Sequence, residues 1–358
     1  MATTSTASNQ LGRPTVVLAV PRPEDSYYRR RWSDIVKFQI SYAKAILSSG
    51  ADNVLLFASC TAMDKAIDGV TGYTLRTELP ADVLVQAELD DIWIRDFSPA
   101  KMSKQVSFSY RPRYLASSYY GNEGAATQRS FVDALSSYGL RIAHMSPLVV
   151  DGGNVVDNDE DKAILMARVY TENKEWTRDE ILEQLHSDLS CPKISIIPDD
   201  RSTTGHADGT VSFLDTNIVA YTDLGETANE ALQLRLRTDF QPDSVQLVKL
   251  PSAAEDAYFR GFDSACGLHV NLLATDSRLY VPTFGADPAN TGQSPALDQR
   301  VLDTIAASGT RKTVVPIPVP HLVCQMGGSV RCLSWQLKGN LADELIVAAR
   351  SRDKCSWK

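Results

Sequence analysis

Short strand-like apolar runs alternate with amphipathic helical stretches along the whole chain, and this alternation limits the possible folds most strongly. Thr15–Val20 has the β-branched composition of a buried strand, and Trp32–Ser49 has the apolar spacing of a helix that packs on a sheet. The strand–helix–strand order recurs about five times without visible sequence identity between the cycles, so any repeat is structural. The pattern predicts a single α/β domain over residues 14–358, preceded by a Thr/Ser-rich segment, 1–13, that is expected to be disordered.

The other elements follow from the same periodicities. One predicted helix, Thr177–Asp188, opens with a capping box formed by Thr177 and Glu180. The remaining predicted helices are Thr61–Asp68, Glu123–Tyr138, Glu226–Phe240, Pro295–Ser308 and Leu341–Arg350. The remaining predicted strands are Val54–Phe57, Val83–Glu88, Leu140–His144, Ala163–Tyr170, Ile194–Ile197, Thr210–Phe213, Ile218–Tyr221, Val245–Leu250, His269–Ala274, Arg278–Val281, Thr313–Ile317 and Val330–Gln336.

Composition excludes several classes of partner. The 358 residues carry a net charge of −8, and the densest basic cluster, Arg29–Arg31, is read as the solvated start of a helix, so nucleic acid is not expected as a partner. No apolar run reaches the roughly 20 residues that span a bilayer, so no membrane contact is expected. Thr15–Val20 is too short for the core of a signal peptide, and the chain is expected to be cytoplasmic.

The six cysteines show neither a framework spacing nor a C-x-x-C pair, and we expect them to be reduced thiols. The His and Asp residues match no common metal-binding spacing, and no G-x-G-x-x-G or phosphate-binding loop is present. No metal and no cofactor are therefore predicted.

Three short polar motifs place one cysteine, one histidine and two aspartates beside apolar runs. Cys332 ends Gly327–Cys332, His206 and Asp208 lie in Gly205–Asp208, and Asp96 ends Trp93–Asp96. Two carboxylates can hold the N–H donors of a planar guanidinium cation and fix its plane. A thiolate can then attack the central carbon, while a histidine protonates the departing amine and later deprotonates a water molecule. These residue types predict a thiol-dependent hydrolase of guanidines.

The chain resembles the agmatine deiminases and bacterial-type peptidylarginine deiminases of the guanidine-modifying superfamily over about Val83 to Gln336. Weaker matches are His269–Asn271 and Val281–Gly285. Four motifs in the family's order carry the resemblance: Trp93–Pro99 (W-x-R-D-x-x-P), Asp151–Asn154 (acidic-Gly-Gly), Gly205–Asp208 (G-H-x-D) and Gly327–Cys332 (G-G-N-x-x-C, with Ser329 in the place of Asn).

The resemblance implies a pentein fold, in which five pseudo-symmetric ββαβ units form an α/β propeller around a central channel. It also implies that Cys332 is the nucleophile and His206 the general acid and base. Asp96 and Asp208 would hold the guanidinium. Substrate-binding roles for Trp93, Asp151 and Asn271 complete the predicted site.

Several alternatives stay open. A free cysteine is more often a core residue than a nucleophile, and Cys324 is the local competitor of Cys332, but it lacks the Gly-Gly approach and is assigned to structure. Amidino transfer to an amine would use the same residues, and a non-catalytic binding protein of this fold is the less favoured reading. Val17–Pro23 does not match the N-terminal pocket segment of agmatine deiminases, so agmatine, free arginine, methylated arginine and peptidyl arginine all remain candidate substrates. A homodimer is common for a chain of this size, and the sequence leaves the oligomeric state open.

Overall fold

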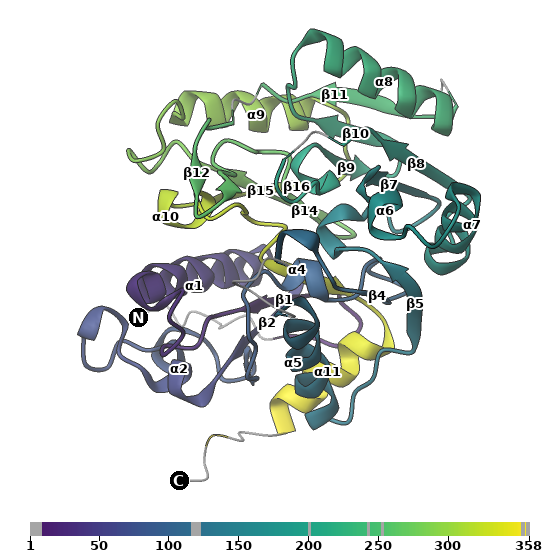
Figure 1. The fold of residues 1–358 in the computed structure, drawn as a ribbon. Helices are drawn as coiled ribbons and strands as arrows, with labels where there is room; N and C mark the ends of the chain where they lie inside the picture. Colours follow the sequence, from purple (N-terminus) through teal and green to yellow (C-terminus); the bar gives the residue numbers. More distant parts are fainter. Residues whose placement is uncertain are drawn as a thin grey trace. The chain divides into compact units, whose positions relative to one another are not determined.

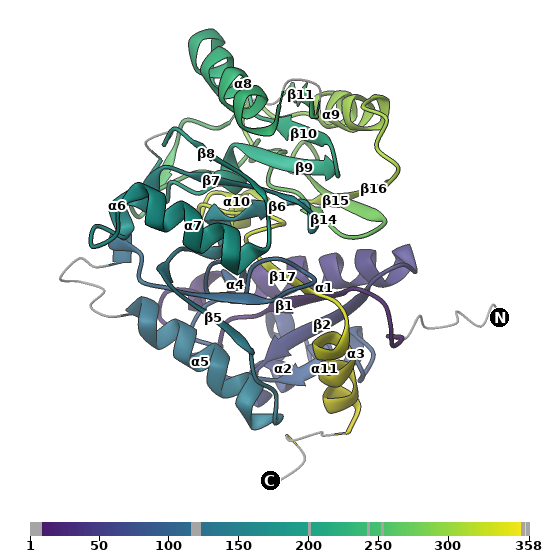
Figure 2. The same cartoon turned by 90° about the vertical axis from the view of Figure 1, so that its right-hand side faces the viewer.

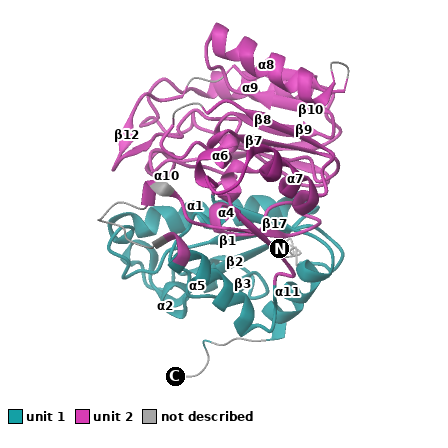
Figure 3. Ribbon diagram, turned by 45° about the vertical axis from the view of Figure 1, so that its right-hand side comes forward, with its two compact units in different colours: residues 1–94, 126–141, 333–358 teal, residues 95–125, 142–332 magenta. Residues whose placement is uncertain are grey.

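The computed structural model describes residues 9–115, 123–199, 202–241, 244–251, 254–351 and 355. Helices and strands alternate through these ranges, as the sequence predicts for a mixed α/β fold (Figure 1). The chain divides into two compact units (Figure 3): unit 1 comprises residues 1–94, 126–141 and 333–358, and unit 2 comprises residues 95–125 and 142–332. This division groups residues by proximity, so the single domain over 14–358 stays a prediction.

Unit 1 is built on a four-stranded sheet with the order β17-β1-β2-β3. β1 (Thr15–Ala19) pairs antiparallel with β17 (Ser334–Leu337) and parallel with β2 (Asn53–Ala58), and all the residues of β1 and β2 are buried. The other elements are η1 (Arg29–Arg31), α1 (Trp32–Ser49), α2 (Cys60–Asp64), η2 (Ile67–Gly69), α3 (Leu75–Glu78), β3 (Leu84–Gln86), α5 (Glu123–Ser137, entering from unit 2) and α11 (Asn340–Ser351).

Residues 1–8 of the N-terminal segment that is expected to be disordered lie outside the described residues. Asn9, however, is buried, and its side-chain amide donates to the carbonyl oxygens of Val54 and Asp82 over 2.9 Å. Its side-chain oxygen accepts a hydrogen bond from the backbone N–H of Val54 at 3.0 Å. The expected disorder therefore does not extend to Asn9, because this side chain satisfies backbone groups near the start of β2 and in the segment before β3.

Unit 2 contains the other sheets. Three of them have three strands, with the orders β6-β7-β8, β11-β10-β9 and β14-β15-β16, and two have two strands, β4-β5 and β12-β13. The strands are β4 (Val106–Ser109), β5 (His144–Val149), β6 (Val156–Asp157), β7 (Lys162–Met166), β8 (Lys193–Ile197), β9 (Val211–Asp215), β10 (Ile218–Tyr221), β11 (Gln246–Lys249), β12 (Tyr258–Phe259), β13 (Phe262–Asp263), β14 (Leu273–Ala274), β15 (Arg278–Thr283) and β16 (Thr313–Pro318). The helices are α4 (Ile94–Phe97, entering from unit 1), η3 (Arg113–Leu115), η4 (Gly152–Asn154), α6 (Arg168–Glu172), α7 (Arg178–Leu189), η5 (Ala207–Gly209), α8 (Glu226–Phe240), α9 (Pro295–Ala307) and α10 (His321–Cys324).

One connection recurs in the described part of the chain: an antiparallel strand pair, then a helix, then a parallel strand. It is seen in β6-β7-α7-β8, in β9-β10-α8-β11 and in β14-β15-α9-β16. β17, β1, α1 and β2 repeat it in unit 1. In a further copy, β4 and β5 pair in parallel and α5 lies between them in the chain. In place of a first strand, this copy has one antiparallel bridge, Ala100↔Val106. The recurrence that the sequence suggests is therefore present as four full copies of one connection and a fifth copy whose first strand is reduced to a single bridge.

Neighbouring copies within unit 2 share apolar cores. β6 contacts β9, so the sheets β6-β7-β8 and β11-β10-β9 lie side by side (Figure 2), and α8 packs on β8. A buried cluster that includes Ile164, Phe213 and Leu236 joins these two sheets to α8. Local sequence signals begin the helices: Thr177 and Glu180 form the predicted capping box of α7, and Ser294 caps α9 ahead of Pro295.

Four predicted strands differ from the structure. Of His269–Ala274, only Leu273–Ala274 is a strand, β14. Leu140–His144 is not a strand, because the strand of this region is β5, His144–Val149. The strand predicted over Ala163–Tyr170 ends at Met166 and α6 follows, where the Arg168 guanidinium donates to the carbonyl oxygens of Thr203 and Thr204. The strand predicted from Val330 begins only at Ser334, since the preceding residues form a loop with tertiary hydrogen bonds.

The prediction that all six cysteines are reduced is wrong for four of them. Cys60 pairs with Cys355 within unit 1, Cys266 pairs with Cys324 within unit 2, and Cys191 and Cys332 are free thiols. The partners are 295 and 58 residues apart in the sequence, so no local spacing could show them. Two disulfides do not support the expected cytoplasmic location, because cytosolic proteins keep most of their thiols reduced. Within the described ranges, no helix combines the length and the apolar character that a membrane crossing needs.

Candidate active site

Cys332 lies in unit 2, at the end of the loop that leads into β17. The side chain is buried, with 8% of the residue exposed, and its carbonyl oxygen accepts a hydrogen bond from the backbone N–H of Arg95 at 3.2 Å. The loop turns at Gly327, whose φ of +102° favours glycine, and a Cβ there would lie 3.2 Å from Cβ of Phe262. The Gly-Gly element of the sequence thus places Cys332 at the end of a loop that approaches the segment around Phe262 closely.

Asn271 organises this loop. Its side-chain oxygen accepts hydrogen bonds from Ser329 Oγ at 3.0 Å and from the backbone N–H groups of Arg331 and Cys332 at 3.2 and 3.4 Å. Its Nδ2 donates to the sulfur of Cys332 at 3.2 Å and to the carbonyl oxygen of Asp208 at 3.3 Å. Ser329, which stands in the family's Asn position, is fully buried and supplies one of these bonds. The amide therefore fixes both the backbone and the sulfur of the loop.

His206 is buried between two carboxylates. Its Nε2 lies 3.0 Å from Oδ2 of Asp151, and its Nδ1 lies 3.6 Å from Oδ1 of Asp96. Burial by itself disfavours the imidazolium, but the charges of Asp96 and Asp151 and the hydrogen bond to Asp151 outweigh it and raise the pKa of His206 to about 9. At neutral pH the ring is thus a cation that can give a proton from either nitrogen.

A glycine makes this arrangement possible. A Cβ on Gly153 would lie 2.5 Å from Nδ1 of His206 and 2.7 Å from Oδ1 of Asp96, closer than a real Cβ approaches. Gly153 belongs to η4, directly after Asp151, so the acidic-Gly-Gly motif supplies the carboxylate and leaves the space beside the ring. The close approach of His206 and Asp96 is therefore a steric reason for the second glycine of this motif.

Asp208 is held by an arginine. Its Oδ2 accepts a hydrogen bond from Nη1 of Arg331 at 2.9 Å and lies 3.8 Å from the sulfur of Cys332. Arg331 also donates from Nη2 to the carbonyl oxygen of Val155 at 2.6 Å. One oxygen of Asp208 is thus engaged by the protein's own guanidinium, which the sequence did not indicate.

A second guanidinium, that of Arg95, is also buried in unit 2. Burial and the nearby positive charge of Arg331 lower the pKa of Arg95 to about 9. Within the described ranges, Nε and Nη2 of Arg95 have no hydrogen-bond partner. Arg95 comes directly before Asp96 on α4, so the motif places a cation and a carboxylate side by side in the chain.

The surroundings of Cys332 favour its protonated thiol. Burial raises the pKa of Cys332 well above its usual value, and the charges of Asp208 and Asp96 raise it further. The hydrogen bonds from the backbone of Ser329 and from Asn271 act in the opposite direction. The two carboxylates that favour the imidazolium of His206 therefore disfavour the thiolate of Cys332.

Unit 2 thus brings together six of the seven predicted site residues: Cys332, His206, Asp96, Asp208, Asp151 and Asn271. The seventh, Trp93, is half-buried and belongs to unit 1, so its substrate-binding role stays a prediction. Asp151, predicted as a substrate ligand, is the hydrogen-bond partner of His206.

Sequence reasoning missed two aromatic neighbours. The ring of Tyr114 lies edge-on to the rings of His206 and Phe262, with centroid distances of 6.1 and 5.8 Å. Neither residue belongs to one of the motifs, and no sequence signal marks them. A group of metal-ligating side chains in the described residues, formed by Glu255, Cys266 and His321, does not include any of the predicted site residues.

The family model of the Porphyromonas-type peptidyl-arginine deiminases matches residues 12–337. Among solved structures, a substrate-bound agmatine deiminase of C. jejuni is 14% identical, with a TM-score of 0.67 over 93% of this chain and 95% of that chain. The agmatine deiminase of Enterococcus faecalis is 15% identical, with a TM-score of 0.68 over 93% and 95% of the two chains. A putative arginine deiminase of Porphyromonas gingivalis is 19% identical, with a TM-score of 0.65 over 93% and 97%.

At these identities the solved structures show a shared fold, and no curated protein matches the sequence. The family model covers most of the chain, including all four motifs that carry the resemblance. The chain belongs to the Porphyromonas-type peptidyl-arginine deiminase family.

Proposed function

We propose that this protein is a hydrolytic deiminase of a small guanidine compound, in which Cys332 is the nucleophile and His206 the general acid and base. The observation that carries the proposal is the position of one thiol and one imidazole beside carboxylates: the sulfur of Cys332 lies 3.8 Å from Oδ2 of Asp208, and Nδ1 of His206 lies 3.6 Å from Oδ1 of Asp96. A cationic planar substrate held by these carboxylates would favour the thiolate of Cys332 and would make the imidazolium of His206 a stronger acid, and the reaction needs both changes.

Binding would begin at the carboxylates. The guanidinium would place its N–H donors on Asp96 and on the oxygen of Asp208 that does not accept from Arg331. Burial and the charges of Asp208 and Asp96 hold the pKa of Cys332 high. The positive charge of the substrate offsets these two charges, so the thiol loses its proton to solvent when substrate is present. Asn271 Nδ2, which lies 3.2 Å from the sulfur, stabilises the resulting thiolate.

The chemical steps then balance as follows. The thiolate forms a bond to the guanidinium carbon, and the imidazolium of His206 gives a proton to one amino group, which leaves as ammonia when its C–N bond breaks. The product of this step is a covalent thiouronium on Cys332. Neutral His206 takes a proton from water, and the hydroxide adds to the same carbon. The C–S bond then breaks while the proton of the new hydroxyl group passes to solvent, which releases a neutral ureido product and the thiolate.

Asp151 would act as a positioning residue. Its hydrogen bond to Nε2 holds the ring so that Nδ1 faces Asp96, where we place the substrate nitrogens. A carboxylate in this position also stabilises the imidazolium that must be present before ammonia leaves.

The five copies of the ββαβ connection support the finer proposal that the fold is a five-fold pentein propeller. The likeness to agmatine deiminases of known structure supports it as well. A homodimer also remains a proposal.

Ammonia release from a panel of guanidines tests the function: agmatine, free arginine, N-methylated arginines, guanidinoacetate and an arginyl peptide. We expect ammonia from at least one of them, and mass spectrometry should show that oxygen has replaced the imine nitrogen. Cys332→Ala should abolish release while the circular-dichroism spectrum stays that of the wild type, and Cys191→Ala, at the other free thiol, should retain activity.

Other outcomes would redirect the proposal. Amidino transfer would be identified if the guanidine is consumed only after an acceptor amine is added and no ammonia is released. Undiminished activity in folded Cys332→Ala would refute the nucleophile. An unreactive Cys332 together with no turnover of any guanidine would favour a binding protein of this fold.

A further inference from the structure

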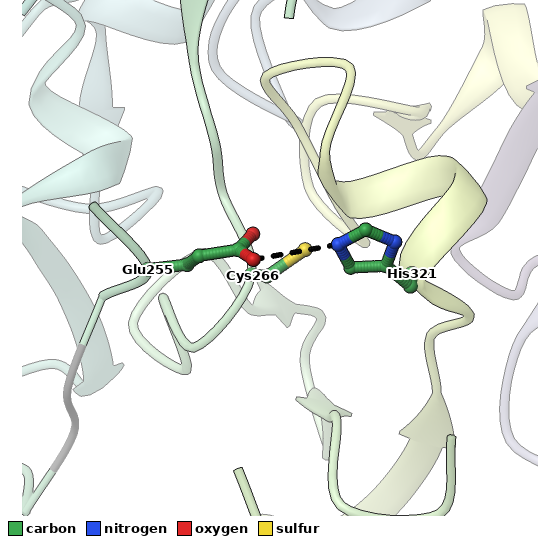
Figure 4. Close-up of side chains that lie close together, drawn as sticks. All are labelled: Glu255, Cys266 and His321. Carbon is green, nitrogen blue, oxygen red and sulfur yellow. Dashed lines mark ion pairs between the residues drawn. The ribbon is translucent and has the colours of Figure 1, made fainter. Parts of the chain in front are cut away.

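Four side chains of metal-ligating type meet in unit 2 around the Cys266–Cys324 disulfide. One ligand atom each from Glu255, Cys266 and His321 lies within 4.8 Å of the others. Figure 4 shows the carboxylate of Glu255 and the ring of His321 facing each other with the sulfur of Cys266 beside them. The fourth side chain is Cys324, whose sulfur is bonded to that of Cys266.

The spacing of the carboxylate and the imidazole suits a metal ion between them. Nε2 of His321 lies 3.4 Å from Oε1 of Glu255, which is longer than an ordinary hydrogen bond. Zinc–nitrogen and zinc–oxygen bonds of about 2.0–2.2 Å at a tetrahedral angle put the two ligand atoms roughly 3.4 Å apart. These two groups therefore need almost no movement to bind one tetrahedral ion.

The second sulfur comes from the same helix as the imidazole. His321 and Cys324 are the first and last residues of α10, and residues three positions apart lie on one face of a helix. In the oxidised protein the two sulfurs are bonded to each other and cannot both bind a metal as thiolates. Two zinc–sulfur bonds of about 2.3 Å require the sulfurs to separate to roughly 3.8 Å, which a change of side-chain rotamer can provide.

Surrounding groups hold the ligands in place before any ion arrives. Oε2 of Glu255 accepts a hydrogen bond from Oγ of Ser264 at 2.7 Å, and the backbone N–H of Glu255 donates to the carbonyl oxygen of Cys266 at 2.9 Å. The backbone N–H of His321 donates to Oδ2 of Asp287 at 2.9 Å. Outer contacts of this kind orient metal ligands in known sites.

We infer that reduction of the Cys266–Cys324 disulfide creates a site for one zinc-type divalent ion. The ligands are Glu255, Cys266, His321 and Cys324, and the bound ion replaces the disulfide as the cross-link between the segments of Cys266 and Cys324. A dithiol reductant supplies two electrons and two protons to the S–S bond and is itself oxidised to a disulfide. The two thiols then lose their protons as the ion binds. Two thiolates, an imidazole and a carboxylate form a ligand set that favours zinc over magnesium or calcium.

The cross-link between Cys266 and Cys324 joins the two segments that position the proposed nucleophile, Cys332. The backbone N–H of Ala265 donates to the carbonyl oxygen of Cys324 at 2.9 Å, and further along the same segments the backbone N–H of Arg331 donates to the carbonyl oxygen of Asn271 at 3.2 Å. A metal ion in place of the disulfide would keep the Asn271 segment against the loop of Cys332 under reducing conditions.

Binding of Co²⁺ as a spectroscopic probe tests the site. The full chain is reduced with a phosphine, which leaves no competing dithiol, and titrated with Co²⁺ under exclusion of oxygen. We expect one equivalent to produce a near-ultraviolet sulfur-to-cobalt charge-transfer band that Zn²⁺ abolishes. The oxidised protein should give no such band.

Matched variants assign the ligands. Cys60→Ser/Cys355→Ser, which removes the other disulfide, and Cys332→Ser should retain the band. Cys266→Ser/Cys324→Ser should lose it, and His321→Ala and Glu255→Gln should each weaken Co²⁺ binding by at least about tenfold, a loss that is typical even for outer contacts.

Absence of the band in reduced, folded wild-type protein would overturn the inference, as would an unchanged band in Cys266→Ser/Cys324→Ser. If that double variant fails to fold, His321→Ala and Glu255→Gln decide the question, because both leave the disulfide intact during folding. Wild-type affinity in both of these variants would then refute the site.

Discussion

The side-chain amide of Asn271 donates a hydrogen bond to the sulfur of Cys332 over 3.2 Å, while its oxygen accepts from the backbone N–H of the same cysteine at 3.4 Å. One side chain therefore determines both the position of the thiol and part of its protonation equilibrium. Because the bond from Nδ2 strengthens when the sulfur is charged, Asn271 favours the thiolate that the nearby carboxylates disfavour.

We predict that Asn271→Asp lowers kcat/KM by about 10- to 100-fold, the effect of losing a hydrogen bond of about 1.5–3 kcal/mol to a charged group. The substitution keeps the size of the side chain but removes the donor and adds a negative charge. Alkylation of Cys332 by iodoacetamide should become slower in the same variant. Asn173→Asp is the matched control, because Asn173 is also buried but bonds to the backbone of Val149, and its activity per folded molecule should be unchanged.

The pair of His206 and Asp151 predicts a pH dependence. His206 must be protonated to release ammonia, so kcat/KM should fall as the pH rises through about 9. In Asp151→Asn the negative charge that raises the pKa of His206 is lost and its hydrogen bond becomes one to a neutral acceptor, so the alkaline limb should move down toward the ordinary histidine value of about 6.5. The charge of Asp96 keeps the pKa from falling the whole way.

The control for this measurement is Asp188→Asn, which breaks a histidine–aspartate pair elsewhere in unit 2, where Nε2 of His144 lies 2.9 Å from Oδ1 of Asp188. Its pH profile should match that of the wild type. An Asp151→Asn profile that keeps its limb at about pH 9 would show that His206 is not the group that titrates.

Asp96 and Asp208 should differ in what they contribute. We predict that each Asp→Asn substitution lowers kcat/KM by about 10- to 100-fold, since each removes a charged hydrogen-bond partner of the guanidinium. Asp208→Asn should also lower the free energy of unfolding by about 3–5 kcal/mol, because it leaves the guanidinium of Arg331 buried without its carboxylate.

A double substitution separates the two effects. Asp208→Asn/Arg331→Met removes the buried ion pair altogether, so urea denaturation should show stability restored toward that of the wild type, while turnover stays low. Recovery of turnover in the double variant would mean that Asp208 acts only by pairing with Arg331 and does not hold the substrate.

Gly153 offers a steric test. In Gly153→Ala the new methyl group would meet Nδ1 of His206 at 2.5 Å and Oδ1 of Asp96 at 2.7 Å, so the ring or the carboxylate must move. We expect a loss of at least about 100-fold in kcat/KM, as found for misplacement by about 1 Å, in a protein that remains folded. Gly209→Ala is the control, because its Cβ would meet nothing nearer than a Leu268 carbon at 3.9 Å. Equal activity of the two variants would contradict the tight approach of His206 and Asp96.

Elements with local signals were predictable. The capping box of Thr177 and Glu180 lies at the start of α7 as expected, and α1 has the predicted bounds, Trp32–Ser49. Elements decided by distant partners were not. The strand predicted through Tyr170 ends at Met166, since the chain turns where Arg168 reaches the carbonyl oxygens of Thr203 and Thr204. Propensity acts over a few residues, so it cannot report such a contact.

The sequence by itself determined the mixed α/β fold, the family and the identities of the candidate residues, because periodicity and motif order are properties of the linear chain. Only the tertiary structure decided that Asp151 faces His206, that Arg331 occupies one oxygen of Asp208, and that Cys60 bonds to Cys355. These contacts join residues separated by 55, 123 and 295 positions. At such separations the pairing depends on how sheets and loops pack, and hydrogen bonds, charges and burial at the meeting point then determine what each side chain can do.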